Sequence, residues 1–365
     1  MPTPLKRPGR SRRTARHATS GDVAKASGVS IMTVSRVFSG KANVDEKTRA
    51  KVMTAARRIG YRPNLIARSL ALSRTRTIGV VIPEISHSFF PEAIRGIEEV
   101  ATTAGYHLLL MHSAEAAGRE YAALHTLESN RVDGILLSVA QDADNARPYT
   151  RVMQTGTPLV FFDRCVRGIG APCVSIDDEE SARVLTHHLI GHGYKRIAHL
   201  AGPGHLAISR DRAAGYRRAH AEAGLVCDPA LTVTAGFHED AGHAAMLSLV
   251  RLPRERRPRA VVAINDPAAY GAIRAITAAG LNVPEDIAVV GFSDDLRASL
   301  MPVPLTTIRQ PAYELGLAAA RSLIAAIEGR REPGKDHVVR AELIVRASCG
   351  CVQRQAMETI GGKRP

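Results

Sequence analysis

Hydrophobic and polar positions divide the chain into a short N-terminal region with helical periodicity and a longer region of alternating strands and helices. The N-terminal region predicts three helices, at residues 22–26, 31–38 and 47–59. Ser30 is expected to cap the second by accepting a hydrogen bond from the N–H of Thr33. Because two helices joined by a short glycine-containing turn have helix-turn-helix geometry, we expect a small all-α headpiece at residues 19–62.

The second predicted helix has one face suited to reading DNA bases. At helical spacing this face carries Ile31, Met32, Ser35 and Arg36, while Val34 and Val37 point back toward the other helices. Arg36 has the donors for a bidentate contact with guanine, whereas Ile31 and Met32 have none and suit thymine methyl groups. The alternative is that Ile31 and Met32 pack in a core and Arg36 is a surface charge.

From residue 78 onward, apolar runs alternate with amphipathic segments, which predicts parallel sheets covered by helices on both faces. Strands are expected at 78–82, 106–111, 134–139, 158–162, 174–176, 196–201, 231–235, 260–264 and 287–291. Helices are expected at 91–104, 119–130, 179–191, 210–223, 240–250, 267–279 and 313–328. Two similar α/β lobes result, with a ligand crevice at the carboxyl ends of the strands.

Charge is distributed unevenly along the chain. Residues 1–76 hold 18 lysines and arginines against three acidic residues, whereas the remaining residues hold 31 basic and 32 acidic ones. A strongly basic module on a neutral body indicates a polyanionic partner. Double-stranded DNA is favoured over an anionic membrane because no basic amphipathic helix bearing Trp or Phe accompanies the charge. Residues 1–18 are expected to be a basic disordered tail.

The five cysteines form no CxxC pair, and Cys349 and Cys351 lack zinc-knuckle spacing. This sparse, odd number suits a reducing cytoplasm, and no apolar stretch approaches the roughly 18 residues of a membrane span. No secretory signal is visible, so we expect a cytoplasmic, nucleoid-associated protein. His188 and His192 have helical metal spacing, but a helix-end role is favoured, and we expect neither a metal nor a cofactor.

Several motifs carry a family resemblance, in order along the chain. They include the run from Asp22 to Ser30 followed by Thr33–Val37, and then Gly60–Asn64, Arg131–Ile135, Asp211–Tyr216 and Leu305–Pro311. With these motifs the chain resembles the LacI/GalR family of bacterial transcriptional regulators from about Thr19 to about Ser348. The resemblance implies a periplasmic-binding-protein-like effector domain at residues 78–350, with a C-terminal tail at 351–365.

The resemblance also implies how DNA is bound. Residues 63–77 would form a hinge helix and linker, and Leu70 from each of two subunits would wedge into the minor groove of a pseudo-palindromic operator. Homodimers suit two-fold operators, and a tetramer is left open. The expected DNA-contacting residues are Ser30, Ile31, Met32, Thr33, Ser35, Arg36, Asn64, Arg68 and Leu70.

A small-molecule effector is expected in the crevice. Its expected contacts are Phe89, Phe90, Asp163, Arg164, Arg212, Phe237, Asn265, Asp266 and Ser293. Aromatic faces with paired donors and acceptors suit a sugar, although each aromatic alone is more typical of a core. Arg164 and Arg212, with Ser293 where the family often has aspartate, favour a sugar acid or a sugar phosphate.

The sequence therefore predicts a DNA-binding transcriptional regulator, a repressor released or recruited by its effector. One alternative is an enzyme on the same α/β body, but GxxxxGK[ST] and GxSxG motifs are absent and no carboxylate pair stands out. Another alternative is a periplasmic solute-binding protein, which the basic headpiece and the missing signal peptide disfavour. The expected protein is not an enzyme.

Overall fold

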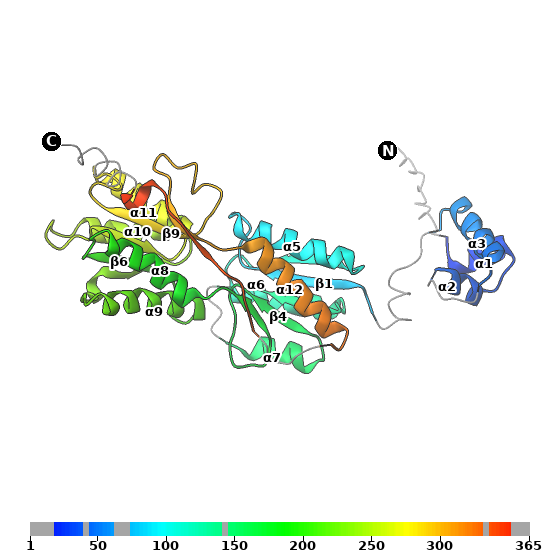
Figure 1. The fold of residues 1–365 in the computed structure, drawn as a ribbon. Helices are drawn as coiled ribbons and strands as arrows, with labels where there is room; N and C mark the ends of the chain where they lie inside the picture. The colour runs from blue at the N-terminus through cyan, green and yellow to red at the C-terminus, as the bar shows by residue number, and fades with distance from the viewer. Residues whose placement is uncertain (1–17, 39–43, 62–73, 141–144, 331–335, 352–365) are drawn as a thin grey trace, which may run out of the picture. The chain divides into compact units, whose positions relative to one another are not determined.

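The computed structural model describes residues 18–38, 44–61, 74–140, 145–330 and 336–351. The chain divides into two compact units, residues 1–75 and 76–365 (Figure 1). The expected basic tail, most of the expected hinge and nearly all of the C-terminal tail lie outside the described residues. No described helix is long and apolar enough to cross a membrane.

Within its described residues, the N-terminal unit contains three short helices, α1 (Ser20–Ser27), α2 (Ile31–Phe38) and α3 (Glu46–Arg58). The Ser30 hydroxyl accepts from Thr33 N at 3.1 Å, so the predicted cap of α2 is confirmed. Asp45 caps α3 by accepting from Thr48 N at 2.9 Å. The helices pack around Val23, Ala24, Val34, Val37, Val52, Ala55 and Ala56.

In the part of the larger unit that the structure describes, the strands form two six-stranded sheets. The first has the order β11-β5-β4-β3-β1-β2, and its strands are β1 (Thr77–Ile82), β2 (His107–His112), β3 (Gly134–Leu137), β4 (Leu159–Phe162), β5 (Cys173–Ser175) and β11 (His337–Val338). Its helices are α5 (Phe89–Thr103), α6 (Ala117–Ser129), α7 (Arg147–Gln154) and α12 (Ala312–Ile327). All its strand pairs are parallel, as the continuous apolar runs predict.

The second sheet has the order β12-β10-β9-β8-β6-β7. Its strands are β6 (Ile197–Ala201), β7 (Thr232–Thr234), β8 (Ala260–Ala263), β9 (Ala288–Ser293), β10 (Thr306–Arg309) and β12 (Glu342–Ile344). Its helices are α8 (Asp178–Gly191), α9 (Ala207–Glu222), α10 (Glu239–Val250) and α11 (Asp266–Ala278), with 3-10 turns η1 (Pro229–Leu231) and η2 (Ala347–Cys349). Only β12 pairs antiparallel, with β10, among the strands described.

Three crossovers join the lobes, between β5 and α8, between β10 and α12, and between β11 and β12. Figure 1 shows two of these segments side by side between the sheets, running into α12 and out of β11. In the first lobe, α5 and α12 pack closely because Gly96 and Gly316 have no Cβ; one added at Gly96 would lie 2.2 Å from Tyr313 O. Three separate connections therefore hold the two lobes together.

The predicted fold class, an α-helical headpiece with a two-lobed α/β domain, is confirmed. The sequence pattern missed α7, β10, β11 and β12. The last two strands have two and three residues, too short for a visible period. The prediction also paired no cysteines, whereas Cys165 and Cys173 form a disulfide.

Candidate functional site

The exposed face of α2 is the first candidate site. Ile31 is 58% exposed and Met32 is 65% exposed, and Ser35 and Arg36 are exposed beside them. Val34, on the opposite face, is fully buried. The alternative that Ile31 and Met32 pack in the headpiece core is therefore wrong. A helix that exposes two large apolar side chains and an arginine presents a surface that can bind another molecule.

The other predicted DNA-contacting residues divide into two groups. Ser30 and Thr33 take part in the cap of α2, where their hydroxyl oxygens lie 2.9 Å apart. Asn64, Arg68 and Leu70 lie outside the described residues. Their roles remain predictions.

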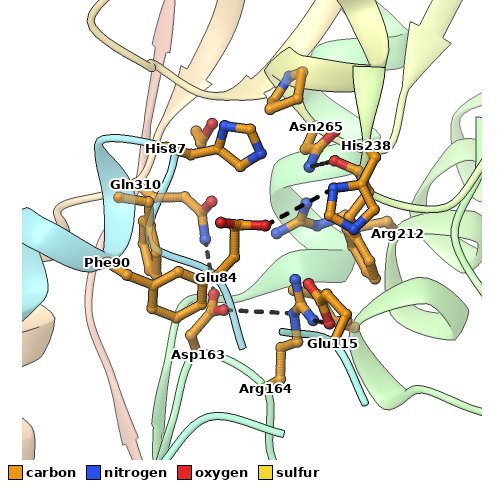
Figure 2. A pocket seen from close by; sticks show the side chains of 15 residues that line it. Glu84, His87, Phe90, Glu115, Asp163, Arg164, Arg212, His238, Asn265 and Gln310 are labelled. Carbon is orange, nitrogen blue, oxygen red and sulfur yellow. Dashed lines mark hydrogen bonds and ion pairs between the residues drawn. The ribbon is translucent and has the colours of Figure 1, made fainter. Parts of the chain in front are cut away.

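The second candidate site is a pocket between the two lobes of the larger unit, shown in Figure 2. It encloses about 500 Å³ of empty space, including the part open to solvent. Eight of the nine predicted contact residues line it: Phe89, Phe90, Asp163, Arg164, Arg212, Phe237, Asn265 and Ser293. The carboxyl ends of the parallel strands bring these distant segments to one place.

Asp266 differs from the other eight because it lies behind the pocket wall. Its carboxylate accepts from Thr307 Oγ1 at 2.6 Å and from Asp295 N at 2.7 Å, and the residue is fully buried. Burial raises the pKa of Asp266 to about 7. In this arrangement Asp266 supports the loops around the pocket, and direct contact with an effector remains a prediction.

The two arginines of the pocket both have buried carboxylate partners. Arg164 donates to Glu115 Oε2 at 2.7 Å, and its Nε lies 3.9 Å from Asp163 Oδ2. Arg212 donates through Nε to Asp178 Oδ1 at 2.8 Å. Burial raises the pKa of Asp178 to about 6, although the adjacent Arg212 favours its ionised form. Both positive charges are thus compensated within the protein.

Aromatic rings lie against both guanidinium groups. Arg164 lies 4.0 Å from the centre of the Phe237 ring, and Arg212 lies 3.6 Å from that of Phe292. Asn265 donates to Phe237 O at 2.9 Å and caps α11 by accepting from Ala268 N. These contacts hold the polar side chains in fixed orientations around the space between the lobes.

Asp163 joins the pocket to a crossover segment. Gln310, which follows β10, donates to Asp163 Oδ1 at 3.3 Å (Figure 2). Burial raises the pKa of Asp163, against the lowering effect of Arg164. A carboxyl group in this position can accept hydrogen bonds from a ligand, or donate one when protonated.

Sequence reasoning missed several lining residues, notably Glu84, His87, Glu115, His238 and Gln310. Both ring nitrogens of His87 are buried without a hydrogen-bond partner among the described residues. Burial lowers the pKa of His87, so the ring is neutral near pH 7. Ligand atoms of Glu84, His87 and His238 lie within 4.8 Å of one another and have the donor set for a metal ion.

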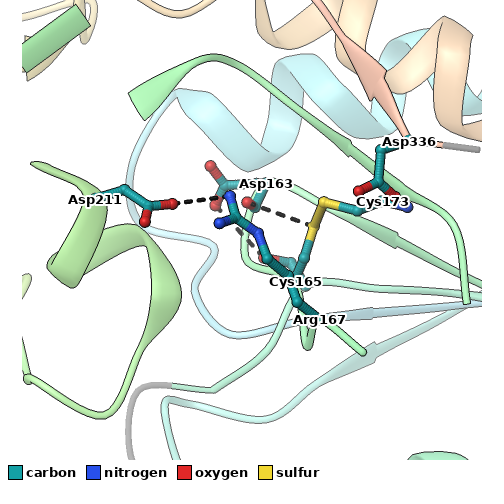
Figure 3. Close-up of a disulfide and its surroundings, with 7 residues drawn as sticks. Asp163, Cys165, Arg167, Cys173, Asp211 and Asp336 are labelled. Carbon is teal, nitrogen blue, oxygen red and sulfur yellow. Dashed lines mark hydrogen bonds and ion pairs between the residues drawn. A yellow bond between two sulfur atoms is a disulfide. The ribbon is translucent and has the colours of Figure 1, made fainter. Parts of the chain in front are cut away.

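A disulfide lies beside the pocket, between Cys165 and Cys173 (Figure 3). The loop that it closes begins directly after Asp163 and Arg164 and carries Arg167, which donates to Asp211 of the second lobe at 2.8 Å. The backbone N–H of Cys173 donates to Asp336 at 2.9 Å, just before β11. The disulfide therefore restrains a loop that contacts both lobes.

Comparison with known proteins gives consistent matches over most of the chain. Residues 20–64 match the family described as "Bacterial regulatory proteins, lacI family", and residues 186–349 match the "Periplasmic binding protein-like domain". The chain is 35% identical over 328 residues to the HTH-type transcriptional regulator RegA of Clostridium saccharobutylicum, covering 90% of this chain and 98% of that protein.

Solved structures agree with these matches. The lac repressor dimer bound to operator and the anti-inducer ONPF has a TM-score of 0.80 at 28% identity, covering 92% of this chain and 99% of that chain. The complex of the transcriptional regulator CelR with cellobiose has a TM-score of 0.69 at 31% identity, covering 91% of this chain and 100% of that chain.

Proposed function

The chain belongs to the LacI family of bacterial regulatory proteins, and on this basis we propose that it is a repressor that binds a pseudo-palindromic operator as a homodimer and responds to a sugar held between its lobes. The family consists of DNA-binding transcriptional regulators and not enzymes, so the enzyme alternative is excluded.

The proposed DNA recognition rests on the exposed face of α2. Insertion of α2 into the major groove would bring Arg36 to a guanine edge and the apolar Ile31 and Met32 to thymine methyl groups. The excess basic charge of residues 1–76 would attract the DNA backbone and make the affinity depend steeply on salt. On family resemblance, Asn64, Arg68 and Leu70 would form the minor-groove contact.

A sugar fits the chemistry of the pocket. Phe89 and Phe237 offer aromatic faces to C–H surfaces, and Asp163, Asn265 and Gln310 offer acceptors and donors to hydroxyl groups. The similarity to a regulator solved with cellobiose supports this class of ligand. Because Arg164 and Arg212 are already paired with carboxylates, a neutral sugar suits the pocket better than the sugar acid or sugar phosphate that the sequence favours.

Lobe closure is the proposed link between effector and operator. Several contacts cross between the lobes, including Arg167 with Asp211 at 2.8 Å and the Ser88 hydroxyl with Asp295 at 3.0 Å. An effector that touches both lobes would favour one relative orientation of them. It changes operator affinity only if it binds the DNA-competent and DNA-incompetent orientations with different affinities.

Exposed apolar side chains support the homodimer. Leu110 lies on the edge strand β2 and is 46% exposed, and Leu296 and Leu300 follow β9 with exposures of 73% and 81%. Large apolar side chains in such positions are typical of protein–protein interfaces. A dimer would place two headpieces on the two half-sites of one operator.

Thermal unfolding of the full chain against neutral sugars, sugar acids and sugar phosphates tests the proposed effector class. A ligand that binds only the folded state increases the free energy of unfolding by RT ln(1 + [L]/Kd), and it thereby raises the midpoint temperature of unfolding. We expect the largest shift with a neutral sugar, and that sugar should change the affinity for operator DNA. A shift with acids alone would contradict the assignment from paired arginines, and no shift with any member would contradict the sugar class.

A further inference from the structure

Two motifs distant in the sequence meet inside the second lobe. His188 lies in the last turn of α8, and Cys349 and Cys351 follow β12 at the end of the described chain. The Cys349 thiol donates to Cys351 Sγ at 2.8 Å, and Cys351 Sγ lies 3.2 Å from His188 Nε2. The three atoms lie within 4.8 Å of one another, and both cysteines are buried.

The backbone around the two cysteines is held firmly against the second sheet. The Ser348 hydroxyl donates to Val289 O at 2.6 Å, and the Tyr194 hydroxyl donates to Cys349 O at 3.1 Å. Gly350 has φ 77°, a left-handed conformation that glycine adopts at no steric cost and that lets the flanking thiols meet. The cluster is therefore part of an ordered segment, and it takes no part in the DNA-binding face or in the pocket.

We propose that His188, Cys349 and Cys351 form a binding site for a divalent metal ion of the zinc class. Two thiolates and an imidazole are the donors that zinc prefers in proteins, with Zn–S near 2.3 Å and Zn–N near 2.0–2.1 Å. A tetrahedral ion holds two sulfur atoms about 3.8 Å apart. Binding therefore needs the two sulfur atoms to separate by about 1 Å, a change within reach of side-chain rotation.

Zinc binds cysteine as the thiolate and histidine as the neutral imidazole, so binding releases the two thiol protons to solvent. Water completes the coordination, as it does in zinc sites with three protein ligands.

This site changes the interpretation of the histidine and cysteine motifs in the sequence. In the sequence, Cys349 and Cys351 lack zinc-knuckle spacing, and His188 and His192 have helical metal spacing without a third ligand nearby. The fold brings His188 and the cysteines together across more than 150 residues. A bound ion would join the C-terminal end of α8 to the segment after β12. The first residue of α8, Asp178, is the partner of Arg212 in the pocket, so the ion would restrain the helix that carries this pair.

Cobalt titration of the full-length, chelator-treated and reduced protein tests the proposal. A cobalt–thiolate bond absorbs in the near ultraviolet, whereas the Glu84, His87 and His238 cluster contains no sulfur. We expect one equivalent of cobalt to produce this band and zinc to abolish it. Cys351→Ser and His188→Gln should weaken zinc binding by more than the roughly 10- to 100-fold typical of losing an outer-shell partner.

Three control variants should keep the cobalt–thiolate band. They are Cys227→Ser, the double variant His87→Ala with His238→Ala, and the double variant Cys165→Ser with Cys173→Ser. Each removes another thiol or another candidate cluster. Loss of the band in the His87 and His238 variant, or its persistence in Cys351→Ser, would overturn the assignment.

A second measurement works on the unaltered protein, in case the variants fold poorly. Zinc should protect Cys349 and Cys351 from alkylation, as read by mass spectrometry, and leave the half-buried Cys227 reactive. If fully reduced protein gives neither the cobalt band nor this protection, the cluster is a thiol pair without a metal and the proposal fails.

Discussion

Arg164 of the first lobe lies with its guanidinium carbon 4.0 Å from the centre of the Phe237 ring of the second lobe. The charge is held in place by Glu115, at 2.7 Å from a guanidinium nitrogen. A cation over an aromatic face is attracted to it, and more strongly where water is excluded. This contact therefore helps to set the distance between the lobes at the proposed effector site.

Substitution of Phe237 by leucine removes the aromatic face and keeps an apolar side chain. We expect Phe237→Leu to weaken effector binding by roughly 0.5–2 kcal/mol, since the pocket loses an aromatic surface and the contact that positions Arg164. Calorimetric titration of the effector measures the change. Phe237→Tyr keeps the ring and is the matched control; equal losses in both variants would show that the aromatic face is unimportant.

The Arg212–Asp178 pair should be important for stability because both side chains are buried, 3% and 6% exposed. Asp178→Ala leaves the Arg212 charge uncompensated, and we expect a loss of about 3–5 kcal/mol in the free energy of unfolding. Urea denaturation measures it. Arg167→Ala, which breaks the more exposed pair with Asp211, should cost at most about 1 kcal/mol. Similar losses in the two variants would contradict the argument from burial.

Titration of Asp266 should contribute to the pH dependence of the free energy of unfolding. Burial raises its pKa to about 7, above the value near 4 of an unfolded chain. The folded state then binds a proton that the unfolded chain has released, so this group lowers stability as pH rises from about 4 to about 7. The difference in free energy of unfolding between Asp266→Asn and the wild type should therefore increase over this range.

Denaturation of both proteins by urea at several pH values gives that difference. Asparagine can replace the protonated acid, with its oxygen toward Asp295 N–H and its amide toward Thr307 Oγ1. Parallel pH profiles for the two proteins would show that Asp266 has an ordinary pKa in the folded state.

The proposed dimer depends on Leu296 and Leu300. Aspartate at both positions would place two charges in an apolar interface, so the double variant should sediment as a monomer at concentrations where the wild type is a dimer. Val226→Asp is the control, because Val226 is 88% exposed and lies elsewhere, after α9. An unchanged dimer in the double variant would place the interface on another surface.

Local chemistry explains which features could be predicted from the sequence. The Ser30 cap, the buried Val34 and the parallel strands follow from neighbouring residues and regular spacing. Glu84, His87 and His238 have no such pattern, since each is a single polar residue in a loop or at a helix end. The fold brings them to the pocket through contacts between lobes that no local period encodes.

The carboxylates that pair with the two pocket arginines could not be identified from the sequence. Arg164 and Arg212 were expected in the pocket, but their carboxylates, Glu115 and Asp178, lie 49 and 34 residues away. Without them the two arginines suggested an acidic ligand. With them, the pocket has its positive charges compensated, and the expectation shifts toward a neutral sugar.

Selection of DNA from a random duplex pool, by the wild type and by Arg36→Ala in parallel, tests sequence-specific operator binding most directly. The wild type should enrich a pseudo-palindrome whose retention falls steeply with salt. Arg36→Ala should lose the base preference at one position in each half-site and bind the selected site more weakly by roughly 1–3 kcal/mol. Arg218→Ala, on α9 of the larger unit, removes the same charge from outside the headpiece sequence and should select the wild-type site. No enrichment by the wild type, or an identical site for Arg36→Ala, would contradict the assigned recognition face.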